Sequence, residues 1–344
     1  MANVNIRTPR FYVDWASYAM SRGTAQNNNF DVITGGNLLA VSTGTEAELF
    51  DMRPLNQISF NTSNVTSKKV LVTIDSESDS GIIPFNFIAI LNHNLTSAQG
   101  KFIIAASDTE NQINNEDFDT GHTDIDAQSG LLVNATVADS GTHAVTPARD
   151  GTTIITFSDT SLRYWGIQFE GSNSGDFDSS ENLKIGGIML GQYYDMPVSP
   201  DLDVKRSITF DTVDVQQSVG GQRFSTMTNH GRIGSSQNLS PFQTDTNRWG
   251  SQGGRMSYDM KFSYLASTHV MPDAYSSLDR DDDAVINDVW NMTNGNHLPF
   301  IFTTDNSSTA ESDYLFARFG KNSFDMTQVA PDVFNVSMRI EEEF

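Results

Sequence analysis

Residues 85–95, FNFIAILNHNL, decide the fold class, because here an apolar run ends abruptly in a histidine between two asparagines. A run of this length predicts one buried strand, and Asn tolerates the backbone angles of a turn. His93 could be a metal ligand, a catalytic imidazole or part of the corner where the strand reaches water. It lacks further ligands at the spacing of metal sites, and the other histidines are isolated. We therefore expect a structural corner.

Similar short apolar runs, separated by Gly, Asn, Asp and Ser, surround this stretch. Runs of this kind are typical of strands joined by turns. Their number and spacing predict an antiparallel β-sandwich, in the form of a jelly roll, over residues 36–196. Residues 197–204, with two prolines, are expected to be a linker. The runs are 69–75, 85–91, 101–106, 131–136, 151–159, 162–170 and 183–191.

Residues 205–344 predict a second antiparallel β-sandwich, because two long segments alternate between apolar and polar residues. Between the two segments, residues 281–294 predict one short helix, with acidic residues at its start and Gly295 at its end. The side chains expected to face inward are Met256, Tyr258, Met260, Phe262, Tyr264, Phe334, Val336, Met338 and Ile340.

Residues 1–35 show no clean period and predict an N-terminal arm that needs a partner surface to order it. The arm contains an aromatic cluster that is unusual for a disordered tail. We expect this cluster to dock on the body of the chain or on a neighbouring subunit during assembly. Its members are Phe11, Tyr12, Trp15 and Tyr18.

The composition excludes several classes of function. The formal net charge of −22 makes nucleic acid a poor partner, although an acid-rich proteome produces the same balance without any function. The absence of cysteine excludes disulfides, thiolate chemistry and Cys-based metal sites. No signal peptide and no apolar stretch of membrane-spanning length is present, so we expect a soluble protein made in a cytoplasm.

Motifs for catalysis are absent as well. The stretch 171–175, GSNSG, has Asn173 where a nucleophile elbow needs serine. Glycine-rich nucleotide-binding loops are missing. We therefore expect neither an enzyme nor a bound cofactor.

The acid-rich segment 114–130 is the most suggestive polar cluster, because Ca²⁺ takes six to eight oxygen ligands from flexible loops. Its spacing departs from the EF-hand pattern, and a solvated acidic loop is the favoured alternative. The candidate calcium ligands are Asp117, Asp119, Asp124 and Asp126.

Four aromatic residues, Tyr164, Trp165, Tyr193 and Tyr194, could stack on sugar rings. In strands of alternating polarity such residues more often belong to the core or to an interface. Glycan binding therefore stays open as a function of the first sandwich.

Taken together, the chain resembles structural proteins of the tail of tailed bacteriophages, closest to the distal-tail or tail-tip adaptors. The first body resembles the carbohydrate-module-like jelly rolls of phage virion proteins through FNFIAILNHNL, LRYWGIQFE (162–170) and LKIGGIMLGQYY (183–194). The second resembles the sandwich of tail-tube-related adaptors. Its matching segments are 206–210, 255–265, 298–305, 314–320 and 329–343.

The resemblance implies a non-enzymatic component of the virion tail, assembled in the host cytoplasm. Such proteins form rings, commonly hexamers, that join the tail tube to the hub, so the implied partners are further copies of the chain and other tail proteins. Neck, capsid-decoration and fibre positions remain open. So does the alternative of a glycan-binding module that recognises the host surface. A secreted polysaccharide hydrolase is the least favoured alternative.

Overall fold

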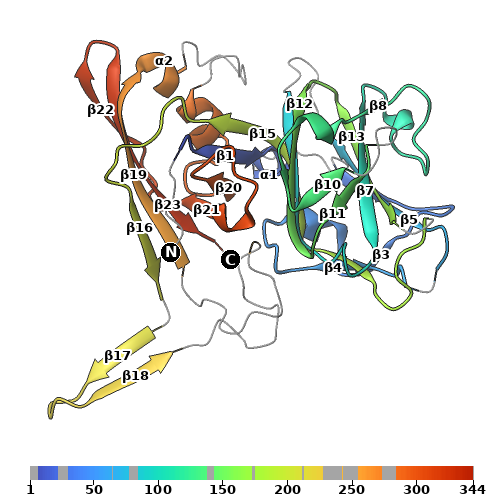
Figure 1. The fold of residues 1–344 in the computed structure, drawn as a ribbon, viewed down its shortest axis with the longest axis horizontal. Coiled ribbons are helices and arrows are strands. Elements are labelled where there is room, and N and C mark those ends of the chain that lie inside the picture. The colour runs from blue at the N-terminus through green and yellow to red at the C-terminus, as the bar shows by residue number, and fades with distance from the viewer. Residues whose placement is uncertain are drawn as a thin grey trace.

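The computed structural model describes residues 7–21, 30–63, 65–76, 84–137, 143–172, 175–210, 213–227, 242, 255–272 and 284–343. The chain is mainly β, and its paired strands are antiparallel (Figure 1). The predicted fold class is therefore confirmed. No helix among the described residues is long and apolar enough to cross a membrane.

The first lobe is a sandwich of two sheets that face each other. One sheet includes β15, β6, β12 and β9 in that order, and the other runs β10-β11-β7-β13-β5-β2, with β8 beside β7. A smaller sheet, β14-β4-β3, closes one end. The bounds are β2 Phe30–Ile33, β3 Val41–Thr43, β4 Ile58–Phe60, β5 Lys69–Asp75, β6 Phe85–His93, β7 Gly100–Ser107, β8 Thr123–Asp124, β9 Leu132–Val133, β10 Ala135–Val137, β11 Val145–Pro147, β12 Gly151–Thr160, β13 Tyr164–Gly171, β14 Leu183–Ile185 and β15 Gly187–Asp195, with 3₁₀ turns at Glu46–Phe50, Glu110–Gln112 and Ala127–Ser129.

Strand β6 is buried along its whole length, which explains why its sequence is a continuous apolar run rather than an alternation. It pairs with β15 on one side and β12 on the other. One face packs into the sandwich core, where the Phe85 ring lies 5.4 Å from that of Trp165. On the other face, Phe87 lies 5.1 Å from Tyr12.

The second lobe continues the same sheet rather than starting a separate one. The 11-stranded sheet runs β16-β19-β23-β21-β20-β1-β15-β6-β12-β9, with β22 beside β23. Its strands therefore come from both sides of the predicted linker in the sequence. Pro200 is buried, and the Asp201 N–H donates to the Lys261 carbonyl at 2.8 Å, which ties the expected linker to β19. The bounds are β16 Lys205–Thr209, β17 Val213–Gln217, β18 Arg223–Met227, β19 Arg255–Ala266, α2 Ser267–Val270, η4 Ile286–Asn291, β20 Phe300–Thr303, η5 Glu311–Asp313, β21 Tyr314–Phe319, β22 Asp325–Ala330 and β23 Val333–Glu342.

The expected N-terminal arm is instead the strand that joins the two lobes. Strand β1 (Arg10–Asp14) pairs with β15 of the first lobe and with β20 of the second, and helix α1 (Trp15–Ser21) follows it directly. The described residues 7–21 therefore belong to the body rather than to a free arm, and the aromatic cluster takes the first of its two expected positions, on the body of the chain. The apolar side chains of β1 are buried against other residues of the same chain.

In the second lobe, alternation predicted the strands correctly, with one exception. Tyr258, Met260 and Phe262 are buried as expected, but Tyr264 is 79% exposed. A bulge between β19 and β23 shifts the register between Phe262 and Leu265 and reverses the direction of the side chains. Tyr264 has a positive φ of 62° at this bulge.

The described part of the predicted helix is the short segment η4, which has π-type hydrogen bonding; residues 281–283 lie outside the description. Val285, Val289 and Met292 are buried, as the apolar stripe predicted. Gly295, with φ of 70°, ends the segment, and its N–H donates to the Trp290 carbonyl at 2.9 Å.

Candidate functional site

The aromatic residues considered for sugar stacking are not free to stack. Trp165 is completely buried between the sheets, and its indole N–H donates to the Leu162 carbonyl at 2.8 Å. Tyr194 is 6% exposed. A sugar ring cannot reach either face of these side chains, so this proposed role is wrong for both. The preference of strand aromatics for the core decides their position.

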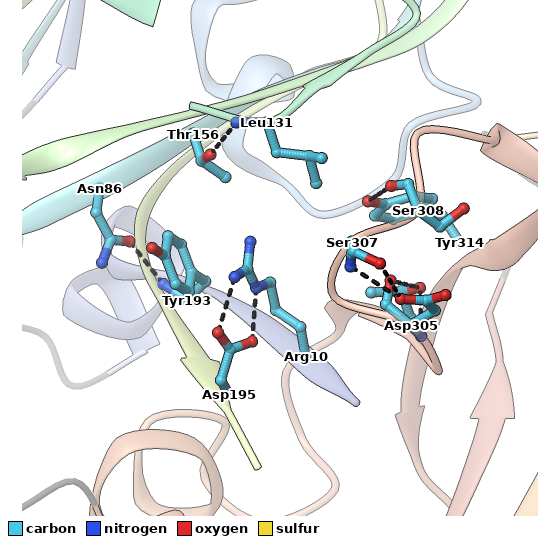
Figure 2. A network of polar contacts seen from close by, with 11 residues as sticks. Arg10, Asn86, Leu131, Thr156, Tyr193, Asp195, Asp305, Ser307, Ser308 and Tyr314 are labelled. Atoms are coloured by element: carbon cyan, nitrogen blue, oxygen red, sulfur yellow. Dashed lines mark hydrogen bonds and ion pairs between the residues drawn. The ribbon is translucent and has the colours of Figure 1, made fainter. Parts of the chain in front are cut away.

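Tyr193 belongs to a polar network where the two lobes meet (Figure 2). Its ring is half-buried, and the Arg10 guanidinium carbon lies 3.9 Å from the ring centroid. Arg10 also donates to both carboxylate oxygens of Asp195, at 2.7 and 2.8 Å. Because a cation already covers this ring, Tyr193 acts here as a structural residue of the lobe junction.

The four aromatic residues of the expected arm all lie in the protein core. Phe11 and Tyr12 are completely buried, Trp15 is 9% exposed and Tyr18 is 6% exposed. Phe11 packs with its ring centroid 5.1 Å from that of Phe302. These side chains cannot form an assembly surface, because they are buried in contacts within the chain.

The acidic loop does not gather its carboxylates around one point. Asp117 pairs with Lys69 at 2.8 Å, Asp124 with His122 at 2.9 Å. Asp126 caps the turn that follows it, where its carboxylate accepts from the Gln128 N–H at 2.8 Å. No described group of three or more ligand residues could hold a metal ion. The structure thus disperses the calcium candidates, and the Asp119 carbonyl, rather than its carboxylate, accepts from the His122 ring at 2.8 Å.

His93 occupies the structural corner predicted from the sequence, and that prediction is confirmed. The side chain is 2% exposed. Its Nδ1 accepts from the Leu95 N–H at 3.2 Å, so Nε2 carries the proton and donates to the Thr153 hydroxyl at 2.9 Å. Burial lowers the His93 pKa to about 3, which keeps the ring neutral.

The asparagines beside His93 hold two loops. The Asn92 side chain donates to the Pro54 carbonyl at 2.7 Å, and the Gln57 side chain donates to the Asn92 carbonyl at 2.7 Å. The Asn94 side chain donates to the Asn182 carbonyl at 2.8 Å. Asn92 itself adopts a positive φ of 46°, a conformation that Asn tolerates.

The loop held by Asn92 forms one wall of a cleft between the lobes, which we call the inter-lobe cleft. Its volume is about 910 Å³, within the range of ligand sites. The second wall comes from residues 297–299, from β21 and from Glu343, which directly follows β23. The lining residues are Ser17, Phe50, Asp51, Met52, Arg53, Pro54, Leu55, Asn56, His297, Leu298, Pro299, Phe316, Arg318 and Glu343.

The polar groups of the cleft fall into paired and unpaired sets. Arg318 pairs with Glu343 at 3.3 Å, and Asp51 accepts from the Arg53 N–H at 2.7 Å. The guanidinium of Arg53 and the imidazole of His297 have no hydrogen bond or ion pair with any described residue. The Ser17 hydroxyl is buried and lies beside the Asp14 carboxylate, with which it interacts. Motif patterns in the sequence gave no signal for this cleft, because its residues come from distant segments.

A second unusual feature is a projecting segment that we call the hairpin extension, residues 205–210 and 213–227. It consists of the edge strand β16 and the hairpin β17–β18, whose strands pair only with each other among the described residues. Figure 1 shows the hairpin standing away from both lobes. Its exposed large apolar side chains are Ile208, Phe210, Val213, Val215, Val219 and Phe224.

Comparisons with known proteins give only a low-level structural likeness. No family model and no curated protein matches the sequence. Three solved structures of carbohydrate-binding modules are similar at low level. The first is chitosan-binding module 1 of a chitosanase/glucanase from Paenibacillus sp. IK-5, with 12% identity and a TM-score of 0.28, covering 47% of this chain and 90% of that one.

The other two come from Clostridium perfringens. The CBM32-1 and CBM32-2 domains of ZmpB have 11% identity and a TM-score of 0.30, covering 56% of this chain and 42% of that one. CBM32-3 of a family 31 glycoside hydrolase has 14% identity and a TM-score of 0.28, covering 48% and 91%. At these identities and scores the likeness carries no inference about binding or activity.

Proposed function

We propose that this chain is a non-enzymatic structural subunit that assembles with further copies of itself through the hairpin extension. The observation that carries the proposal is the concentration of exposed apolar side chains on a hairpin without support from the body. Val215 is 56% exposed and Phe224 is 55% exposed. An isolated two-stranded hairpin is marginally stable in water, so a covering surface would stabilise it.

The distribution of charge favours a second copy of the chain as the surface that covers the hairpin extension. Residues 205–227 carry three basic and two acidic residues, whereas the whole chain has a formal net charge of −22. The body is therefore strongly acidic and the extension is not. An extension that docks on the body of the next copy brings complementary charges together, and such head-to-tail contacts build rings when they close.

The resemblance to distal-tail and tail-tip adaptors extends the proposal to a specific place. In that form of the proposal the chain builds a ring in the tail of a tailed bacteriophage and joins the tail tube to the hub. The expected partners are then further copies and neighbouring tail proteins. A neck, capsid-decoration or fibre position would use the same contacts between copies.

Light scattering of the purified chain tests the assembly. We expect a closed oligomer for the wild type and a lower mass for the double variant Val215→Ser and Phe224→Ser, because burial of apolar area drives the contact. Val329→Ser is the matched control, since Val329 is 45% exposed but lies outside the extension. An oligomer that the double variant leaves unchanged, or a monomeric wild type, would count against the proposal.

Glycan binding is a second candidate function, and the inter-lobe cleft favours it. The cleft combines apolar side chains such as Leu55 and Leu298 with donors and acceptors such as Asn56 and Glu343. Sugars present apolar CH faces and hydroxyl groups together, which suits a lining of this kind. Isothermal titration calorimetry with oligosaccharides tests it, and heat of binding that disappears with cleft variants is the expected result.

A further inference from the structure

We propose that the outer face of β19, β23 and β22 binds a neutral, extended oligosaccharide, with Tyr264 as the ring on which a sugar stacks. We call this face the Tyr264 platform, and it consists of Tyr264, Lys261, Thr327, Asn335 and Ser337. The platform shares no lining residue with the inter-lobe cleft, and the proposal does not depend on assembly. Figure 1 shows β19 and β22 on the side of the second lobe away from the first.

Tyr264 is an exposed aromatic residue in a strained backbone conformation. It is 79% exposed, more than any other aromatic residue in the described part of the chain. Its φ of 62° is uncommon for a bulky side chain, and bulges with a positive φ usually carry glycine at this position. A side chain holds the conformation, because the Tyr264 N–H donates to Asn335 Oδ1 at 3.1 Å. Bulges re-aim side chains, and strained residues cluster at ligand sites, so we infer that the exposed ring receives a ligand.

Strand register places hydrogen-bonding side chains next to this ring. Thr327 of β22 lies opposite Asn335 of β23, and Ser337 of β23 lies opposite Lys261 of β19. The side chains of Thr327, Ser337 and Lys261 are exposed. Sugars present apolar CH groups and hydroxyl groups together, which matches an aromatic ring beside hydroxyl, amide and amino groups.

A shallow hollow continues the platform along the strands. Its volume is about 210 Å³, and its lining includes Lys261, Ser337 and Arg339. Along β23, the step from Asn335 beside the ring to Arg339 in the hollow spans roughly 14 Å at the rise of an antiparallel strand. A binding surface of this length favours an extended chain of sugar rings over a single sugar.

The charges of the hollow favour a neutral ligand. Its lining contains three basic and two acidic residues, so the surplus of either sign is small. Two of the basic side chains are already paired, Arg339 with Glu341 at 2.6 Å and Lys321 with Asp325 at 3.4 Å. A charged ligand would compete with these ion pairs, whereas sugar hydroxyls donate and accept without displacing them.

Calorimetry with three oligosaccharides of equal length tests the proposal. Cellohexaose is neutral and extended, maltohexaose is neutral and curved, and hexagalacturonate carries carboxylates. We expect the wild type to bind cellohexaose most tightly and Tyr264→Gly to weaken this binding about tenfold or more, as truncation of a central aromatic contact does. Tyr264→Phe keeps the ring and should bind as the wild type does. So should Arg53→Gln, the control for the inter-lobe cleft.

The glycine variant also separates a binding role from a structural one. Glycine adopts a positive φ without strain, so Tyr264→Gly should be at least as stable as the wild type in urea unfolding. Weaker binding without lower stability is the result expected of a ring that serves a ligand. A marked loss of stability would show that the ring packs against the chain, and would count against the proposal.

The remaining outcomes are equally definite. A Tyr264→Gly chain that binds cellohexaose like the wild type, or a wild type that binds none of the three probes, overturns the platform as a saccharide site. Tighter binding of maltohexaose or hexagalacturonate overturns the ligand class. Binding that is lost with Arg53→Gln instead moves the saccharide to the inter-lobe cleft, which overturns this proposal and supports the second candidate function. Light scattering of the same samples reports on assembly separately.

Discussion

At the residue scale, three consecutive side chains in the sequence Asn-His-Asn organise one end of the first lobe. Asn92 fixes the loop that lines the inter-lobe cleft, His93 ties β6 to Thr153 of β12, and Asn94 anchors Asn182. The polar side chains satisfy backbone groups at the point where a buried strand ends. The corner is therefore structural, yet it positions a wall of the candidate site.

The buried neutral His93 predicts a pH dependence of stability. Its pKa is about 3 in the folded chain and near 6.5 when unfolded, so the unfolded state binds the extra proton between these values. Stability is therefore fully present above pH 6.5 and is lost as pH falls. We expect roughly 2 kcal/mol of loss from this group between pH 7 and 5. Urea unfolding of the wild type and of His93→Gln, compared at both pH values, measures the difference.

Asp14 acts in the opposite direction and must be separated from His93. Burial raises the Asp14 pKa to about 6, against hydrogen bonds from the Ser17 hydroxyl and from the Leu190 and Ser17 backbone N–H groups. The folded state therefore holds the proton between about pH 4 and 6, and this contribution is lost as pH rises. Measuring His93→Gln in both the wild-type and the Asp14→Asn background isolates the histidine. An unchanged pH difference on removing His93 would contradict its burial as a neutral ring.

Substitution of Trp165 tests whether it is a core residue or a sugar-stacking residue. Its ring lies 5.8 Å from Phe157 and 5.4 Å from Phe85, within the sandwich. We expect Trp165→Ala to lower the free energy of unfolding by about 3–5 kcal/mol through the cavity it leaves. Chemical denaturation measures this loss. Normal stability with lost saccharide binding would instead restore the stacking role.

The residue types alone could not assign these aromatic roles. Alternation in 162–170 shows which residues share a face of a strand, but not whether a second sheet covers that face. The covering of Trp165 and Tyr194 depends on strands distant in the sequence. Likewise Arg53 and Arg318 lie far apart in the chain, and only the sheet that spans both lobes brings them to one cleft.

At the scale of elements, β1 is the largest departure from the sequence prediction. A five-residue strand followed directly by a helix shows too few repeats for a clear period, so it resembles an arm. Both of its edges are paired, with Tyr12 beside Tyr193 of β15 and Ile301 of β20. Its position between the lobes makes it a structural link that cannot be released for exchange between subunits without opening the sheet.

A proline in β1 tests this role. Proline removes a backbone N–H and is excluded from the middle of a sheet, so Tyr12→Pro should cost about 3 kcal/mol or more. Tyr12→Phe is the matched control, because it keeps the ring and the strand. Urea unfolding compares the two. A proline variant as stable as the phenylalanine variant would mean that β1 is an arm after all.

At the scale of the whole molecule, composition and periodicity were sufficient to predict the class of fold. They did not predict that one sheet extends through both lobes. Many short runs predicted antiparallel sheets, and the structure has them. Two prolines predicted a break between domains at residues 197–204. However, β1 pairs with β15, which precedes this segment, and with β20, which follows it, so one sheet includes strands from both sides. Strand pairing between distant segments leaves no local pattern, so the single 11-stranded sheet could not be foreseen.

Charge and apolar area should contribute separately to assembly. Arg206 and Arg223 are exposed on the hairpin extension, while the chain as a whole is strongly acidic. We expect the double variant Arg206→Glu and Arg223→Glu to assemble less than the wild type in dilute buffer, measured by sedimentation velocity. At 1 M salt the Debye length is only about 3 Å, so this variant should recover wild-type assembly.

The apolar variant gives the contrasting result that makes the test decisive. Val215→Ser with Phe224→Ser should remain impaired at high salt, because salt does not replace lost apolar contact. Recovery of both variants would indicate that neither the apolar side chains nor the charges of the hairpin extension are required for assembly at high salt. Failure of the charge variant to recover would show that Arg206 or Arg223 makes a buried, directional contact instead. Both variants thus test the proposal that copies of the chain meet through the hairpin extension rather than through the N-terminal strand.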